Sequence, residues 1–369
     1  STLCPMKRSL TSSASAATVS AAGTRRPRPP GALLRRTRPL SGSSGAVLPR
    51  GAPQARGVAM AAARSVAQAA AVGQTGLKER LKEDAQYRGL GAFLMSGSPL
   101  VAELMAHAGY DFLVVDMEHS PVDVHGALPM LQAVAAAGRP ALVRVALNRP
   151  ELIKKALDLG PAGLIVPLVD SAEEARAVAA ACRYPTRGLR GVAYPLVRAS
   201  AWGLDANYVR RCEKQCLVLC QVETPAAVNA VEDILQVDGV DGIFVGPLDL
   251  SASLGHLGDT RHADVRSALA RIEAAAAKHP SKVLAGFAGG RRAHAMFAGG
   301  YRLVATSADV ALLRDAARVD IAAAAAPAPA AAAAAARPGE VVVVPGAEEG
   351  AEAESAGNGG SPSPAAKKR

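Results

Sequence analysis

Three short apolar runs decide the fold class: FLVVD at residues 112–116, ALVRV at 141–145 and GLIVP at 163–167. Each is followed by a stretch with helical spacing, such as 151–159 after the second run or 171–183 after the third. Runs that stay apolar without alternation indicate strands buried on both faces, which is typical of parallel strands covered by helices. The sequence therefore predicts repeated strand–helix units.

The same unit recurs over roughly 235 residues of the chain. Five further apolar runs, which bring the total to eight, lie at 91–95, 217–223, 242–246, 282–287 and 302–307. Eight such units in this length predict an α/β fold of the (β/α)8 barrel type. A doubly wound open sheet is the alternative, but no Gly-x-Gly-x-x-Gly motif follows the first run. The longer segment 184–208, between the fourth and fifth units, has the length of a functional loop.

The two ends of the chain differ in composition from this central part. Of the 42 Lys and Arg residues, 12 precede the first acidic residue, Glu79, so the rest carries 30 basic and 32 acidic residues. Residues 1–78 are rich in Arg, Ser, Ala and Pro, which predicts an organellar transit peptide, mitochondrial or plastid. A basic arm that contacts nucleic acid is the alternative, but it holds no aromatic residue to stack on bases.

Residues 322–369 consist of Ala and Pro repeats followed by Gly, Glu and Ser, which predicts a low-complexity tail and limits the barrel to 79–321. Half of all residues are hydrophobic, so the central part can bury a large core. No apolar run is long enough to span a bilayer, so a membrane is not expected as partner. The part of the chain after residue 78 is close to neutral, so a nucleic acid is not expected as partner either. Five cysteines are too few to stabilise a domain of this size by disulfides, which favours a reducing compartment.

Polar side chains recur at one end of the predicted strands. They are Asp116 and His119 at the second run, Arg144 in the third, Gln221 and Glu223 at the end of the fifth, and Asp249 after the sixth. The active site of a (β/α)8 barrel lies at the carboxyl ends of its strands. Each residue alone has another interpretation, such as a helix cap, a packing histidine or an internal ion pair. Their coincidence on four strands favours an active site.

Glu223 and Asp249 follow neighbouring strands, and two carboxylates placed in this way suit a hard cation such as Mg²⁺ or Mn²⁺. A thiol metal site at Cys212, Cys216 and Cys220 is the less favoured interpretation, because Cys220 lies inside the fifth strand and breaks the helical spacing. A phosphate site in the loop 286–292 is a further alternative, although that loop lacks a full phosphate motif. No lysine occupies an interior strand position, which argues against Schiff-base chemistry.

Several longer motifs occur in a specific order, among them LVVDMEHSP (113–121), LVRV (142–145), GLRGV (188–192), QVET (221–224) and GVDGIFVGPLDLSASLG (239–255). Together they resemble the HpcH/HpaI aldolase/citrate lyase family, most closely its 2-oxo-3-deoxy acid aldolase branch. The resemblance covers about residues 88–318. It implies a divalent-metal-dependent aldolase that cleaves a 4-hydroxy-2-oxo acid to pyruvate, or a related 2-oxo acid, and an aldehyde. The implied metal is Mg²⁺ or Mn²⁺, with Co²⁺ as a further candidate.

The resemblance also implies roles for individual residues: metal binding by Glu223 and Asp249, substrate binding by Gln221 and the backbone at Gly246 and Leu248, enolate stabilisation by Arg144, and catalysis by His119 with Asp116 and Asp158. A metal acting as Lewis acid, a fixed cation and a histidine that titrates near neutrality suit this reaction. The family further implies a homo-oligomer, a hexamer with exchanged C-terminal helices. Two alternatives are a CoA-thioester lyase of the citrate lyase branch and a non-catalytic barrel.

Overall fold

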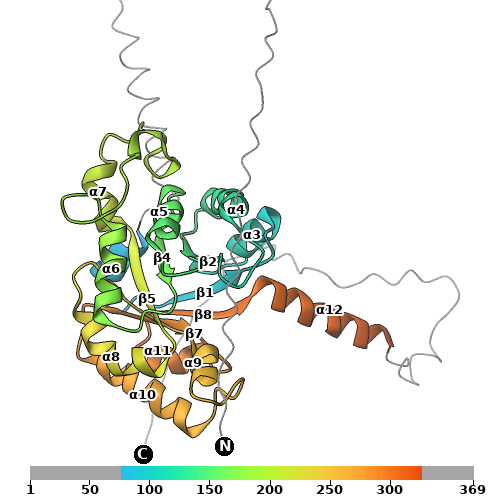
Figure 1. Cartoon of the computed structure of the whole chain (residues 1–369). Coiled ribbons are helices and arrows are strands. Elements are labelled where there is room, and N and C mark those ends of the chain that lie inside the picture. Colours follow the sequence, from blue (N-terminus) through green and yellow to red (C-terminus); the bar gives the residue numbers. More distant parts are fainter. Residues whose placement is uncertain (1–75, 326–369) are drawn as a thin grey trace, which may run out of the picture. The chain divides into compact units, whose positions relative to one another are not determined.

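The computed structural model describes residues 76–325 of the 369-residue chain, and within them eight parallel strands close into a barrel in the order β1 to β8 (Figure 1). The strands are β1 Gly89–Leu94, β2 Phe112–Asp116, β3 Ala141–Arg144, β4 Gly163–Val166, β5 Leu217–Val222, β6 Gly242–Val245, β7 Val283–Phe287 and β8 Leu303–Ala308. The predicted (β/α)8 barrel is confirmed. The predicted ends, 1–78 and 322–369, lie outside the described residues except for 76–78 and 322–325.

Helices alternate with the strands, and most of them cover the outside of the barrel. They are α2 Leu77–Glu83, α3 Pro99–His107, α4 Val124–Ala136, α5 Pro150–Asp158, α6 Ala172–Cys182, α7 Tyr208–Gln215, α8 Pro225–Gln236, α9 Pro247–Ser253, α10 Ala263–Ala277, α11 Ala293–Ala298 and α12 Asp309–Ala325. Several begin with proline, whose fixed φ and missing N–H suit the first helical position. Thr224 caps α8 by accepting a hydrogen bond from the backbone N–H of Ala227 (3.0 Å).

The core has two parts. Side chains such as Phe112, Leu142 and Phe244 fill the inside of the barrel, and a larger aliphatic cluster packs between the strands and the helices. Helix α2 closes the amino end of the barrel, because Leu77 and Leu81 are buried in the inner cluster. The interior is therefore packed, and the open space for chemistry lies at the ends of the strands.

Two segments depart from the regular strand–helix alternation. The predicted long loop joins α6 to α7 and contains two 3-10 helices, Tyr194–Leu196 and Arg198–Ser200. Helix α12 extends away from the barrel (Figure 1), and Asp309 is its one buried residue among those described. The carboxylate of Asp309 accepts hydrogen bonds from the backbone N–H groups of Met95 (2.8 Å) and Ser96 (3.1 Å), which fastens the start of α12 to the end of β1. None of the described helices combines the length and apolar character that a bilayer crossing requires.

Candidate active site

Asp116 and Arg144 form a buried ion pair at the ends of β2 and β3. The two residues are partners in the strand register, so their side chains leave the barrel wall at the same level. Arg144 donates from Nε to Oδ1 (2.8 Å) and from Nη2 to Oδ2 (2.7 Å) of Asp116. Burial alone would lower the pKa of Arg144, but the hydrogen bond and charge of Asp116 outweigh it and raise that pKa. The pair holds a permanent cation in a defined orientation.

Glu118 lies beside this pair, two residues after Asp116, and is a site residue that the sequence motifs did not predict. Its Oε2 atom is 3.2 Å from Nε of Arg144 and 3.8 Å from Nε2 of His119, but it is buried without a well-oriented hydrogen bond. Burial raises the pKa of Glu118 to about 7; Arg144 opposes the rise, and the carboxylates of Glu223, Asp116 and Asp249 add to it. Its spacing from Asp116 is the sequence signal that could have identified Glu118, because residues two apart in an extended segment point to the same face.

Glu223 lies at the end of β5 and is 2% exposed. Its Oε1 atom accepts a hydrogen bond from the backbone N–H of Leu168 (2.8 Å), and Oε2 accepts one from the side-chain amide of Gln221. Burial raises the pKa of Glu223, and the charge of Asp249 acts in the same direction. The positive charge near Glu223 is therefore too small to offset the cost of burying its carboxylate.

The environment of Glu223 fits a hard divalent cation. The side-chain oxygen of Gln221 is buried and has no hydrogen-bond partner among the described residues. Asp249, in the first turn of α9, is exposed, so its carboxylate is open to a ligand. Oxygen donors of this kind are the ligands that Mg²⁺ and Mn²⁺ prefer. Gly246 keeps the space clear, since a Cβ atom there would lie 2.8 Å from Oε2 of Glu223.

A cavity of about 360 Å³ opens at this end of the barrel. It is lined by His119, Arg144, Gly246, Leu248 and Asp249 together with an aromatic wall of Phe93, Phe244 and Phe287. Phe93 packs edge-on against the other two rings, with centroid distances of 5.9 Å and 5.8 Å, and lies 4.7 Å from the guanidinium of Arg144. The cavity therefore combines a polar floor with an apolar side, as expected for a site that binds a small organic anion.

Asp158 is placed apart from the other predicted site residues. It ends α5, and the C-terminal end of this helix leads to the amino end of β4, at the opposite end of the barrel. Its carboxylate accepts a hydrogen bond from Nη2 of Arg190 (2.8 Å). Within one chain it does not join His119, so its catalytic role stays a prediction.

The loop after β7, considered above as a phosphate site, contains Arg291. This arginine is paired with Glu273 (2.7 Å), so its charge is already partly neutralised.

A closed (β/α)8 barrel with carboxylates, a histidine and an arginine at the carboxyl ends of its strands has the form of an enzyme of this fold class. The chain belongs to the HpcH/HpaI aldolase/citrate lyase family, whose profile matches residues 90–316. This finding confirms the resemblance seen in the motifs.

Curated relatives and solved structures agree with this family. The chain is 42% identical over 254 residues to a hydroxypyruvate/pyruvate aldolase of Paraburkholderia phytofirmans, which covers 66% of this chain and 94% of that protein. It is 43% identical over 180 residues to a 4-hydroxy-2-oxo-heptane-1,7-dioate aldolase of Shigella boydii, 49% of this chain and 69% of that protein. The crystal structure of an HpcH/HpaI aldolase/citrate lyase family protein from Burkholderia cenocepacia has a TM-score of 0.64 and 42% identity, covering 68% of this chain and 99% of that chain.

Proposed function

We propose that this protein is a divalent-metal-dependent aldolase that reversibly cleaves a 4-hydroxy-2-oxo acid to pyruvate, or a related 2-oxo acid, and an aldehyde. The observation that carries the proposal is the meeting of Arg144, His119 and Asp249 in one cavity of about 360 Å³, next to the buried Glu223. The aldolase names of relatives at 42% and 43% identity support the same class of reaction.

Glu223 and Asp249 are the proposed metal ligands, with Mg²⁺ or Mn²⁺ as the preferred ions and Co²⁺ as a further candidate. The bound ion would supply Lewis-acid polarisation of the keto group of the substrate. The unpartnered oxygen of Gln221 and the raised pKa of Glu223, caused first by burial, both favour a cation at this place. Gln221 and the backbone at Gly246 and Leu248 are proposed to hold the 2-oxo acid.

Arg144 and His119 carry the proposed chemistry of the protein itself. When the bond between C3 and C4 breaks, negative charge develops on the keto oxygen, and the guanidinium of Arg144 is held in place by Asp116 to stabilise it. His119 lines the same cavity and would take the proton of the 4-hydroxyl group in cleavage and return it in condensation. Glu118, 3.8 Å from His119, is the acid placed to orient that ring.

Exchange of the methyl protons of pyruvate in D₂O tests the proposal. The full chain with Mg²⁺ or Mn²⁺ is expected to deuterate pyruvate, followed by NMR, and Glu223→Gln should abolish the exchange. Glu232→Gln is the matched control, because Glu232 is a half-exposed acid on α8, paired with Lys278 on the outside of the barrel. Absence of exchange with every divalent ion would overturn the aldolase proposal. Cleavage of a malyl- or citryl-CoA thioester without such exchange would favour the citrate lyase branch.

The proposal also includes the oligomeric state of the protein. Helix α12 exposes Leu313 (70%), Val319 (70%) and Ile321 (67%), more apolar surface than a helix in water normally leaves uncovered. We infer that a second copy of the chain covers this face in a homo-oligomer, a hexamer by family resemblance. Light scattering should report the hexamer, and Leu313→Asp with Ile321→Asp should reduce the mass to smaller species.

The expected organisation of the chain completes the proposal: a transit peptide over 1–78, a barrel over 79–321 and a low-complexity tail over 322–369. Among the described residues α2 begins at Leu77 and α12 ends at Ala325, so the helices extend slightly past both bounds. Residues 1–75 and 326–369 lie outside the described part, so composition alone supports these assignments. Residues 1–78 fused to a fluorescent protein should direct it to mitochondria or plastids. A diffuse cytosolic signal in both animal and plant cells would contradict an organellar location.

A further inference from the structure

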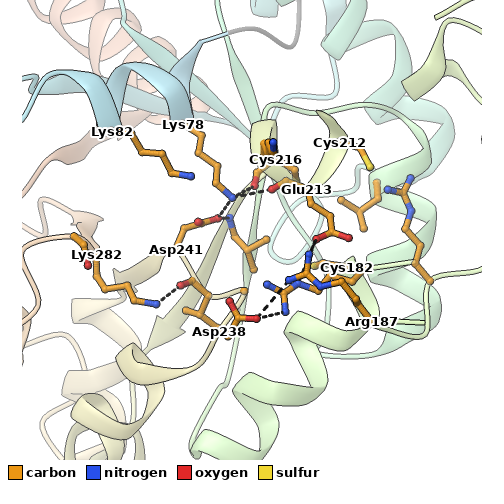
Figure 2. A pocket seen from close by; sticks show the side chains of 18 residues that line it. Lys78, Lys82, Cys182, Arg187, Cys212, Glu213, Cys216, Asp238, Asp241 and Lys282 are labelled. Atoms are coloured by element: carbon orange, nitrogen blue, oxygen red, sulfur yellow. Dashed lines mark hydrogen bonds and ion pairs between the residues drawn. The ribbon is translucent and has the colours of Figure 1, made fainter. Parts of the chain in front are cut away.

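A second cavity, of about 310 Å³, lies at the amino end of the barrel (Figure 2). Its walls come from α2, from the end of α6 with the loop that follows it, from α7, and from the residues that precede β6 and β7. The candidate active site lies at the carboxyl ends of the same strands. The two cavities are therefore on opposite ends of the barrel, and the second one plays no part in the proposed aldol chemistry.

This cavity carries an excess of positive charge. Seven of its lining residues are Lys or Arg, and three are Asp or Glu. Each acid already has a cationic partner: Asp241 pairs with Lys78 (2.7 Å), Asp238 with Arg183 (2.6 Å), and Glu213 with Arg187 (2.8 Å). The acids of the wall are thus paired. Of the four remaining cations, Arg190 is paired with Asp158 (2.8 Å) outside the wall, and three lysines have no acidic partner within 4 Å in the described part of the chain.

Three lysines carry part of this excess. In the described part of the chain, Lys82 on α2 and Lys214 on α7 are exposed and make no ion pair or side-chain hydrogen bond. Lys282 donates only to the carbonyl oxygens of Val237 (3.1 Å) and Val240 (2.6 Å). Figure 2 shows Lys82 and Lys282 on the same side of the cavity, with the ammonium of Lys282 joined to a backbone oxygen. Burial lowers the pKa of Lys282, although the charges of Asp241 and Asp238 oppose this, so its ammonium would gain from an anion nearby.

Arg190 adds a buried donor. It is 4% exposed, and its Nη2 atom donates to Asp158 (2.8 Å) and to the hydroxyl of Tyr208 (3.1 Å). Its Nε atom is buried without a hydrogen-bond partner among residues 76–325. A buried guanidinium N–H without a partner costs free energy, so an acceptor that reached Nε after a small shift of the Arg190 side chain would be favoured.

We propose that this cavity binds a small polyanion, a phosphorylated or multiply carboxylated metabolite, between Lys82, Lys214, Lys282 and Arg190. Water occupies about 30 Å³ per molecule in the liquid, so the cavity has room for roughly ten waters, or for a phosphate group with a short carbon skeleton. Lysines supply mobile point charges and arginine supplies fixed donors, the combination that recognises phosphate and carboxylate oxygens. Such an anion would join α2 to α7 and to the start of β7.

Calorimetric titration of the full chain with pyrophosphate, without divalent metal, tests the proposal. Saturable binding is expected, and the double variant Lys82→Ala with Lys214→Ala should weaken it about five- to tenfold, because two exposed charges are lost. Lys154→Ala with Lys155→Ala is the matched control, since both lysines are exposed on α5 and do not line the cavity. The control should bind as the unmodified chain does. A parallel titration with citrate separates a preference for phosphate from one for carboxylates.

Two cysteines in the wall of the cavity allow anion binding to be detected by thiol labelling. Cys212 and Cys216 lie in its wall, and burial raises the pKa of the Cys212 thiol, so labelling with N-ethylmaleimide is run at alkaline pH. Bound pyrophosphate should slow labelling of Cys212, measured by peptide mass spectrometry. The proposal is overturned if neither anion binds saturably, if the Lys82 and Lys214 variant binds as tightly as the control, or if binding leaves the labelling rate unchanged.

Discussion

The carboxylate of Asp116 and the guanidinium of Arg144 form a bidentate ion pair, with distances of 2.8 Å and 2.7 Å, at the ends of adjacent strands. Asp116 is completely buried and Arg144 is 9% exposed. Because neither charge reaches solvent freely, each depends on the other, and the pair is both a structural element and the source of the cation in the candidate active site.

Asp116→Asn is therefore expected to destabilise the fold. The variant removes the bidentate partner of Arg144 and leaves its buried charge with only Glu118, 3.2 Å from Nε. Breaking a buried pair on one side costs about 3 kcal/mol. Urea unfolding followed by circular dichroism measures the change in the free energy of unfolding. Asp123→Asn is a control without a buried partner, since Asp123 is exposed at the start of α4. Equal stability of the two variants would contradict a structural role for the pair.

Glu118 predicts a dependence of stability on pH in the metal-free protein. Its pKa is raised from 4.5 to about 7, chiefly by burial, so the folded state binds more protons than the unfolded state between these values. The contribution of Glu118 to stability is thus lost as the pH rises from about 4.5 to about 7. Glu118→Gln should be less sensitive to pH over this range, as measured by thermal unfolding. Parallel curves for both proteins would show that Glu118 ionises normally.

Removal of a metal ligand should weaken metal binding. Asp249→Asn keeps the size of the side chain and loses its charge, and it is expected to lower the affinity for Mn²⁺ at least about tenfold, because one of two anionic donors is gone. Paramagnetic titration measures the free ion directly. Asp259→Asn, an exposed acid in the loop after α9, is the control. Equal Mn²⁺ affinities of the two variants would show that Asp249 is not a metal ligand.

Gly246→Ala tests the space beside Glu223. The added Cβ atom would lie 2.8 Å from Oε2 and 3.3 Å from Cβ of Glu223, so the carboxylate must shift. The rate of pyruvate proton exchange is expected to fall about tenfold or more, whereas the fold persists. Gly126→Ala in α4 is the control, as its new Cβ atom would have ordinary contacts at 3.5 Å and alanine favours a helix. Loss of activity in both variants would point to a general effect on folding.

His119→Ala should reduce turnover without loss of pyruvate binding. A positioned acid or base contributes roughly 10²- to 10⁴-fold to a rate, so kcat for aldol cleavage should fall within this range. Calorimetry with pyruvate and Mg²⁺ should give an unchanged affinity. His125→Ala is the control, because His125 lies exposed on α4 away from the cavity. Unaltered turnover would remove His119 from the proposed mechanism.

Much of the fold followed from the sequence because its signals are local. The apolar run at 112–116 coincides with β2, and that at 163–167 overlaps β4, since a parallel strand buried on both faces needs an uninterrupted apolar segment. The first strand begins at Gly89, two residues before the predicted run, because a single leucine, Leu90, between two glycines does not form an apolar run. Charged residues after such runs also located the carboxyl end of the barrel without knowledge of any contact.

The tertiary structure decided which of these residues meet. The register between β2 and β3 pairs Asp116 with Arg144 and brings Glu118 beside them. The direction of α5 carries Asp158 to the opposite end, where it binds Arg190. The cationic cavity there joins residues as distant as Lys78 and Lys282, which no local pattern connects. Periodicity reports how one segment is buried, whereas contacts between segments depend on barrel closure, strand register and helix packing, and these are properties of the whole folded chain.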